Sequence, residues 1–192
     1  MTTTLAPDIF TNVHKGIRQA LFAATRALGR AGDDATRLVR ARDLLRDALR
    51  FVAHHGDNED VLLLPLLAQA APDVHARMTA AHAALHEPLA ALQASLASAP
   101  SDLLYARAAH FTARYLEHMD DEEQALEPRI RAALTVEQLA RFSRESVTRT
   151  APAEQRMMIA FMLPAMTRGD VDALLARLPA PLAADLRPLA GD

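Results

Sequence analysis

The chain has 192 residues, of which 51% are hydrophobic and 23% charged, and this fits one domain with a sizeable core or a compact domain with a small appendage. The net charge of -3 argues against a general nucleic-acid binder or a basic protein of membrane surfaces. Because cysteine is absent, disulfides, thiolate metal sites, iron–sulfur clusters and a cysteine nucleophile are excluded. Any metal must therefore be held by nitrogen and oxygen.

The N-terminal stretch MTTTLAPDIF has neither a basic start nor an apolar targeting segment. Charged residues interrupt every apolar stretch that is long enough to approach a membrane span. We therefore expect no membrane partner and a cytoplasmic location.

Alanine, leucine and arginine dominate, and apolar residues recur at helical intervals, which predicts an all-α protein. A first helix should cover residues 7–28 and end at the glycines of GRAG. A second should begin at Asp33 or Asp34, which are good N-cap residues, and continue to about Ala70. Pro65 should bend this helix or end its regular part.

A third helix should open at APDVHARM and stop near Pro100, where Ser101 or Asp102 can cap a fourth helix that runs to about Leu134. Long helices with short connections favour an antiparallel up-down four-helix bundle, because brief loops leave sequential helices as neighbours. We assign this bundle to residues 1–134.

The remaining residues, 135–192, should form a helical extension that packs on the bundle or lies at a homodimer interface. Its first helix opens with TVEQ, which matches the capping-box pattern. Two shorter helices follow, in TAPAEQRMMIAFML and in RGDVDALLARL.

The second and fourth predicted helices carry one pattern, H-x-D-x-E-x-x-x-L-x-P. It appears when HGDNEDVLLLPLL, from His55, is aligned with HMDDEEQALEPRI, from His118, at a shift of 63 residues. The matched positions are His55 with His118, Asp57 with Asp120, Glu59 with Glu122, Leu63 with Leu126 and Pro65 with Pro128. A weaker echo relates HKGIRQAL, from His14, to HAALHEPL, from His82. Each half thus supplies a histidine helix followed by a His/Glu helix.

Residues four apart on a helix share a face, with about 5–6 Å between their Cβ atoms. The pairs with this spacing are His55 with Glu59, His82 with His86, and His118 with Glu122. Helices packed around one axis can aim such pairs at a common point, and bundle cores hold paired metal ions in this way. Nitrogen and oxygen donors suit iron, manganese or zinc, whereas many imidazoles argue against magnesium and calcium.

The predicted metal ligands are His14, His55, Glu59, His82, His86, His118 and Glu122. Two octahedral ions offer about twelve coordination positions. The five imidazoles would fill five of them, the two glutamates four if both bridge the ions, and one oxo or hydroxo bridge two more, so about eleven are filled. The remaining position is where dioxygen, peroxide, nitric oxide or azide would bind.

The order and spacing of these ligands over residues 8–134 resemble the hemerythrin family, whose members are often called HHE cation-binding domains. The resemblance implies a four-helix bundle around a non-haem di-iron centre with an oxo or hydroxo bridge. In oxygen-carrying hemerythrins the last carboxylate lies five residues after its histidine, which corresponds to Glu123. Many HHE proteins use a spacing of four, which corresponds to Glu122, and the internal repeat favours Glu122.

Other polar residues near the ligands are expected outside the metal shell. We read His54 as a neighbour, because the repeat aligns it with Glu117, and we place Arg18 on the surface rather than in a salt bridge beside the site. The polar residues that should form a solvated face, or alternatively hold a ligating histidine in one tautomer, are Asp57, Asn58, Asp60, Asp120, Asp121 and Glu123. Tyr115, three residues before His118, is the candidate for a hydrogen bond to a bound small molecule.

Three hypotheses of function follow. The first is a di-iron protein that binds dioxygen, nitric oxide or peroxide for storage, delivery or sensing, and we favour it over an enzyme. The second is a di-iron oxidase or peroxidase with Tyr115 as proton donor. The third is a helical interaction module that a metal stabilises, with manganese or zinc as substitutes for iron.

Overall fold

The computed structural model of the protein describes residues 7–190, and these residues form helices and no β-strand. The all-α prediction is therefore confirmed. The long helices are α1 (Thr11–Ala31), α2 (Ala35–Asn58), α4 (Pro72–Ser95) and α5 (Ser101–Asp121). The shorter elements near them are η1 (Glu59–Leu63), α3 (Leu64–Ala70), η2 (Glu122–Leu126) and α6 (Glu127–Ala133).

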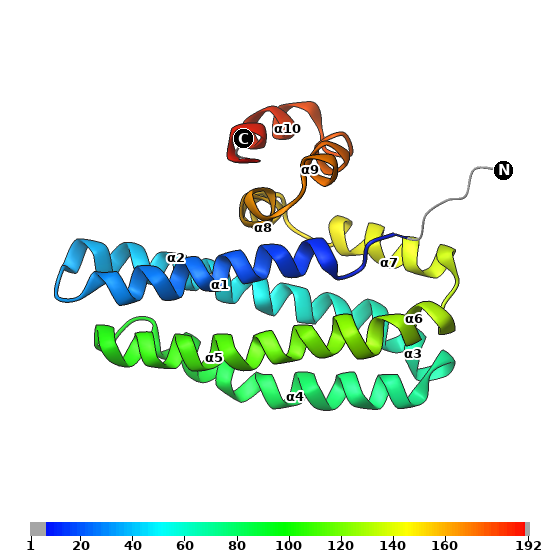
Figure 1. Cartoon of the computed structure of the whole chain (residues 1–192), viewed down its shortest axis with the longest axis horizontal. Helices are drawn as coiled ribbons and strands as arrows, with labels where there is room; N and C mark the ends of the chain where they lie inside the picture. The colour runs from blue at the N-terminus through cyan, green and yellow to red at the C-terminus, as the bar shows by residue number, and fades with distance from the viewer. Residues whose placement is uncertain (1–6, 191–192) are drawn as a thin grey trace.

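The long helices lie side by side, and the chain reverses direction from each of them to the next (Figure 1). Helix α1 packs against both α2 and α5, and α4 packs against α5, α3 and α2. None of the helices in residues 7–190 is long and apolar enough to cross a membrane.

The helix ends agree with several expected caps. Asp34 caps α2, because its side chain accepts a hydrogen bond from the backbone N–H of Arg37. Gly32 follows α1 with a φ of 49°, a left-handed conformation that favours glycine. Pro100 precedes α5, and no side chain there caps the helix, so the prediction of a cap by Ser101 or Asp102 was wrong.

The repeated pattern gives the same local distortion in both halves. Residues Glu59–Leu63 and Glu122–Leu126 are π-helical, and each segment begins at the glutamate of the pattern. The backbone N–H of Leu64 donates to the carbonyl of Glu59, five residues back. The proline that follows has no N–H, which weakens the regular α-helical ladder at this point. Pro65 was expected to bend or end the helix, and the regular part in fact ends earlier, at Asn58.

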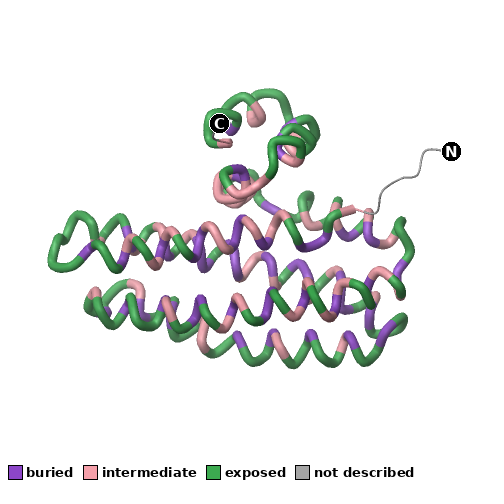
Figure 2. Tube along the Cα trace, viewed as in Figure 1, coloured by how far each residue is buried: buried purple, intermediate pink, exposed green. Residues whose placement is uncertain are grey.

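Two apolar clusters form the core of this helical array, and His14, Glu59, His82 and Glu122 each fall, along the chain, between residues of one cluster and residues of the other. One cluster includes Leu21, Leu49, Leu92 and Phe111, and the other includes Phe10, Leu67, Met78 and Ile130. Figure 2 shows the buried stripe that runs along the inward sides of the helices. Burial of these side chains fixes the helices around the polar residues between the clusters.

The C-terminal elements are α7 (Val136–Thr148), α8 (Pro152–Met162), η3 (Leu163–Ala165), α9 (Arg168–Leu175), α10 (Ala180–Leu186) and η4 (Arg187–Ala190). Thr135 and Gln138 form the predicted capping box of α7. Helix α8 packs against α1, while α9 and α10 share a separate small apolar cluster with α8 (Figure 1).

Candidate metal centre

Side chains from separate helical stretches converge on one point inside the array. They form two groups of four whose ligand atoms lie within 4.8 Å of one another. The first group is His14, His55, Glu59 and Glu122, and the second is Glu59, His82, His118 and Glu122. Both groups therefore contain the same two carboxylates and a different pair of imidazoles.

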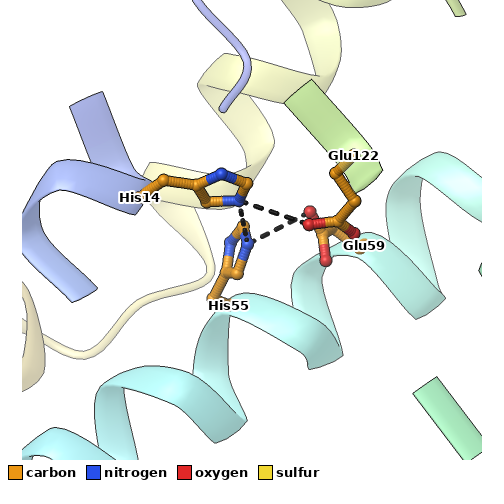
Figure 3. A group of neighbouring side chains, drawn as sticks. All are labelled: His14, His55, Glu59 and Glu122. Atoms are coloured by element: carbon orange, nitrogen blue, oxygen red, sulfur yellow. Dashed lines mark hydrogen bonds and ion pairs between the residues drawn. The ribbon is translucent and has the colours of Figure 1, made fainter. Parts of the chain in front are cut away.

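The first group joins α1, the end of α2 and both π-helical segments, and its four side chains point toward one another (Figure 3). The Nε2 atoms of His14 and His55 are 3.0 Å apart. His14 Nε2 lies 3.4 Å from Glu122 Oε2, and His55 Nε2 lies 3.2 Å from Glu59 Oε1. The ring of Phe10 stacks on His14 with 5.2 Å between ring centroids, which keeps that imidazole away from solvent.

The second group adds one imidazole from α4 and one from α5. His118 Nε2 is 3.2 Å from Glu122 Oε1. His82 Nε2 is 3.5 Å from Glu59 Oε2 and 3.6 Å from Glu122 Oε1, so it faces both carboxylates. Each half of the site thus offers two nitrogen and two oxygen donors.

The carboxylate oxygens are buried without hydrogen-bond partners. Glu59 and Glu122 are both 0% exposed, and all four of their side-chain oxygens lack a hydrogen bond, as does Nε2 of His82. Leaving buried ionised groups unsatisfied costs several kcal/mol, so such an arrangement is rare unless a cation completes it. The donors fit a pair of transition-metal ions of the kind that imidazole and carboxylate prefer.

Protonation of the imidazoles differs in a way that reflects their neighbours. Burial lowers the pKa of His14, but the carboxylate of Glu122 at 3.4 Å and the hydrogen-bonded carboxylate of Glu123 outweigh it and raise the pKa to about 9. Burial opposes protonation of His82 too, yet the Glu122 and Glu59 carboxylates raise its pKa to about 11. Burial lowers the pKa of His55 well below its usual value, and it also lowers the pKa of His118.

The two glutamates also differ. Burial and the charge of Glu122 raise the pKa of Glu59 to about 8. Burial acts in the same direction on Glu122, but the nearby imidazoles of His14 and His82, at 3.4 and 3.6 Å, prevail and hold its pKa well below the usual range. In the metal-free chain, protons on His14 and His82 therefore balance part of the buried negative charge, and metal cations would take their place.

The structure brings six of the seven predicted ligands together, namely His14, His55, Glu59, His82, His118 and Glu122. The seventh, His86, is exposed and belongs to neither group. It lies in α4 two residues before Pro88, whose missing N–H leaves the carbonyl of Ala84 without its helical donor. Arg114 donates to that carbonyl instead, at 3.1 Å.

Glu123, unlike Glu122, belongs to neither group of four and lies behind His14. Its Oε1 accepts a hydrogen bond from Nδ1 of His14 at 2.8 Å, on the side of the ring that faces away from the two groups. Arg18 donates to both oxygens of Glu123, at 2.8 and 3.1 Å. The prediction of Arg18 as a surface residue was therefore wrong: its guanidinium forms a salt bridge with a carboxylate beside the site.

Asp60 occupies the matching place in the other half. Its Oδ1 accepts from Nδ1 of His82 at 2.5 Å. The prediction of a solvated face was wrong for Asn58, which is buried at 7% exposure. It was also wrong for Asp60 and Glu123, which take the alternative role of a partner to a histidine of the site. The available sequence signal was the repeat, which aligns Asp60 with Glu123 directly after the aligned glutamates.

A cavity of about 250 Å³ adjoins the second group. His82 and His118 line it, and His14 and His55 do not. Most of its other lining residues are apolar or aromatic, such as Leu85, Leu89 and Phe111. Its other polar lining residues are the exposed His86 and the acidic Asp57 and Asp60. Tyr115 lies in the wall, 3% exposed, with its ring centroid 5.3 Å from that of His118.

The fold and the site together define a class: an all-helical protein with a buried His/Glu cluster that could hold cations. The model of the hemerythrin HHE cation-binding domain family matches residues 5–130 of the chain. The chain therefore belongs to the hemerythrin HHE cation-binding domain family, as its ligand pattern predicted. No curated protein and no solved structure gave a match in the corresponding comparisons.

Proposed function

We propose that this protein is a hemerythrin-type di-iron protein. Its up-down four-helix bundle holds two iron ions and binds dioxygen or a related small molecule, such as nitric oxide or peroxide, for storage, delivery or sensing. One observation carries the proposal: Glu59 and Glu122 belong to both four-residue groups, so the same two carboxylates can bridge two ions.

The residues have distinct tasks in this proposal. His14 and His55 hold one ion, His82 and His118 hold the other, and the two shared glutamates fix the separation of the pair. Bound iron supplies reversible uptake of a small molecule through an open coordination position. The apolar clusters on both sides of the site exclude bulk water and strengthen the interactions of the buried charges.

The position of the cavity indicates which half of the site the small molecule would reach. It reaches the histidines of the second group and not those of the first, so we assign the open position to the ion between His82 and His118. The lining is mostly apolar, its acidic members are Asp57 and Asp60, and no lysine or arginine of residues 7–190 lines it, so it suits an uncharged diatomic molecule better than an anion.

Anaerobic loading with ferrous iron, followed by exposure to air, tests the proposal. We expect about two iron ions per chain and a charge-transfer band of a bridged iron pair. Glu59→Ala should lose the band and at least one ion, whereas His110→Ala, at an exposed histidine of α5, should retain both. Wild-type protein that takes up zinc but no iron would overturn the proposal and favour the metal-stabilised interaction module.

An oxidase or peroxidase is the second candidate, and the position of Tyr115 favours it. The ring of Tyr115 lines the cavity, and its centroid lies 5.3 Å from that of the His118 ring. Burial raises the pKa of its hydroxyl well above the usual value, so the hydroxyl keeps its proton at neutral pH. Iron-loaded protein should then turn over hydrogen peroxide, and Tyr115→Phe should slow turnover while iron content stays unchanged. Absence of turnover in the wild type would leave the carrier or sensor function.

A further inference from the structure

Two carboxylates outside the metal groups contact two of the four clustered imidazoles. Asp60 follows Glu59, and Glu123 follows Glu122. Asp60 meets Nδ1 of His82, and Glu123 meets Nδ1 of His14. An ionised carboxylate only accepts hydrogen bonds, so Nδ1 must carry the proton in both rings. The lone pair of a neutral imidazole is then on Nε2, the atom that faces the shared glutamates in both cases.

Each half of the site therefore has one imidazole whose Nδ1 is hydrogen-bonded to a carboxylate, and we call such an imidazole anchored and the carboxylate its anchor. His14 is anchored in the first group and His82 in the second, while neither His55 nor His118 has a side-chain carboxylate hydrogen-bonded to its ring within the described residues. A carboxylate behind a ligating histidine fixes the orientation and tautomer of the ring and increases its strength as a ligand. Any difference between the two anchors becomes a difference between the two metal positions.

The anchors differ in how firmly they are held. Glu123 is 20% exposed and receives two hydrogen bonds from Arg18, in a bidentate arrangement that fixes its orientation. Asp60 is 37% exposed, and no lysine or arginine among residues 7–190 pairs with it. Solvent water can therefore compete with His82 for hydrogen bonds to Asp60 more readily than with His14 for hydrogen bonds to Glu123.

The surroundings of the anchored rings differ in the same direction. His14 is 0% exposed and lies under the stacked ring of Phe10. His82 lines the cavity of about 250 Å³, which gives water and chelators a path to it. Both differences favour tighter retention of a cation beside His14 than beside His82.

We infer that Glu123 and Asp60 are positioning residues, and that their unequal anchoring makes the metal positions unequal. The position of His14 and His55 fills first and releases its ion last, and the position of His82 and His118 exchanges its ion more freely. This inference rests on the proposed binuclear site. It adds an order of loading and the residues that set that order.

Titration of the metal-free chain with cobalt(II) tests the inference, because the optical spectrum of this ion follows its ligand geometry. Wild-type protein should bind in two steps of different affinity. Glu123→Ala should weaken the tighter step by about 10–100-fold and leave the weaker step unchanged, as is usual for groups that orient a ligating histidine. Asp60→Ala is the matched variant and should weaken the second step alone.

Variants that remove one position identify the steps. His118→Ala keeps the first position, and in this background Glu123→Ala should reduce affinity while Asp60→Ala should not. His55→Ala keeps the second position, and in this background Asp60→Ala should reduce affinity while Glu123→Ala should not. Arg18→Ala leaves both carboxylates in place and should weaken only the tighter step, by less than Glu123→Ala does.

Conservative variants distinguish loss of the hydrogen bond that orients a histidine from unfolding of the chain. Glu123→Gln and Asp60→Asn retain size and a hydrogen-bond acceptor, so part of the affinity lost in the alanine variants should return. Thermal unfolding of each metal-free variant checks that the chain is folded. Two equal steps in the wild type, or equal effects of Glu123→Ala and Asp60→Ala on both steps, would overturn the inference alone. A wild-type chain that binds no metal would overturn the binuclear site as well.

Discussion

Glu59 and Glu122 occupy equivalent positions in the two halves of the molecule, each at the first residue of a π-helical segment and each fully buried. The backbone carbonyl of each accepts a hydrogen bond from an N–H five residues later, at Leu64 and Glu127. Both side chains face the site, and a proline, Pro65 or Pro128, lies two residues after the last residue of each segment. The symmetric pair of carboxylates is thus a product of the repeated sequence.

Pro65→Ala tests whether the proline maintains this local geometry. Alanine restores a backbone N–H, which can bond four residues back and favours regular α-helix over the π-helical turn. We expect metal affinity to fall by about tenfold or more, as it does when groups that orient ligands are lost. The free energy of unfolding of the metal-free chain should not fall, because a helix-interior proline has been removed.

Pro128→Ala should have the same two effects, because it alters the equivalent position of the second segment. Pro72→Ala is the control, since Pro72 lies at the start of α4, where no helical N–H bond is expected. Isothermal titration with cobalt(II) measures the affinity. Unchanged affinity in both Pro65→Ala and Pro128→Ala would show that the prolines do not maintain the ligand geometry.

The convergence of six residues at the candidate site could be predicted because the sequence signal is local and occurs twice. His55 with Glu59 and His118 with Glu122 each share a helix face at a spacing of four, and the 63-residue repeat tied the pairs together. The all-α class followed from composition and periodicity. His86 has the same spacing from His82, yet the structure leaves it exposed, since spacing specifies a face of the helix and not the side-chain position.

The supporting contacts could not be predicted in the same way. Arg18 and Glu123 are 105 residues apart, and their contact depends on how α1 lies beside η2. The π-helical turns were also missed. Pro65 shows that one N–H is absent, but the sequence does not show which carbonyl the preceding N–H of Leu64 selects. Both features depend on tertiary packing and not on local propensity.

Metal binding should release protons. In the metal-free chain the pKa of His14 is about 9, that of His82 about 11 and that of Glu59 about 8, so all three groups hold an exchangeable proton near neutral pH. A metal ion needs the same atoms, so protons compete with it. Apparent affinity should therefore rise steeply with pH up to about 8, where Glu59 loses its proton, and less steeply above it as His14 and then His82 lose theirs.

Addition of cobalt(II) to the metal-free chain in a weakly buffered solution should acidify it, and a pH indicator measures the change. Glu59→Gln has no carboxyl proton to lose and should release fewer protons per ion bound. His110→Ala should match the wild type, because this histidine is exposed and lies outside both groups. Binding without acidification, or affinity that falls as pH rises, would contradict the assigned protonation of the site.

Gly16 is predicted to be essential for the contact between α1 and α8. A Cβ at this position would lie 2.5 Å from Cγ of Met162 and 3.1 Å from Cε1 of Phe51, closer than carbon atoms approach without displacement. Gly56 is also helical, but a Cβ there would meet no atom within 4 Å. Both substitutions to alanine gain about 1 kcal/mol of helix propensity, so their difference isolates the steric effect.

Urea unfolding of the metal-free variants should place Gly16→Ala about 1–3 kcal/mol below Gly56→Ala in free energy of unfolding, which is the usual cost of overpacking. Limited proteolysis gives a second readout, since displacement of α8 should expose residues 152–190 to cleavage. If Gly16→Ala is as stable as Gly56→Ala, then α8 does not pack closely on α1 in solution.

Thr150 joins the C-terminal helices to α2 beside the metal centre. Its hydroxyl donates to the carbonyl of Ser146 at 2.7 Å and must therefore accept from Nε2 of His54, also at 2.7 Å. Thr150 is 5% exposed, so Thr150→Val keeps the shape of the side chain and leaves the His54 N–H without its partner. We expect a loss of about 1–3 kcal/mol in free energy of unfolding.

Thr148→Val is the matched control, because Thr148 is exposed and bonds only locally to the carbonyl of Glu145. It should change the free energy of unfolding by less than about 0.5 kcal/mol. Because His54 lies next to His55 but outside both metal groups, Thr150→Val should bind cobalt(II) with wild-type affinity. Reduced affinity in Thr150→Val, with normal affinity in Thr148→Val, would show instead that the C-terminal helices help to orient the metal ligands through His54.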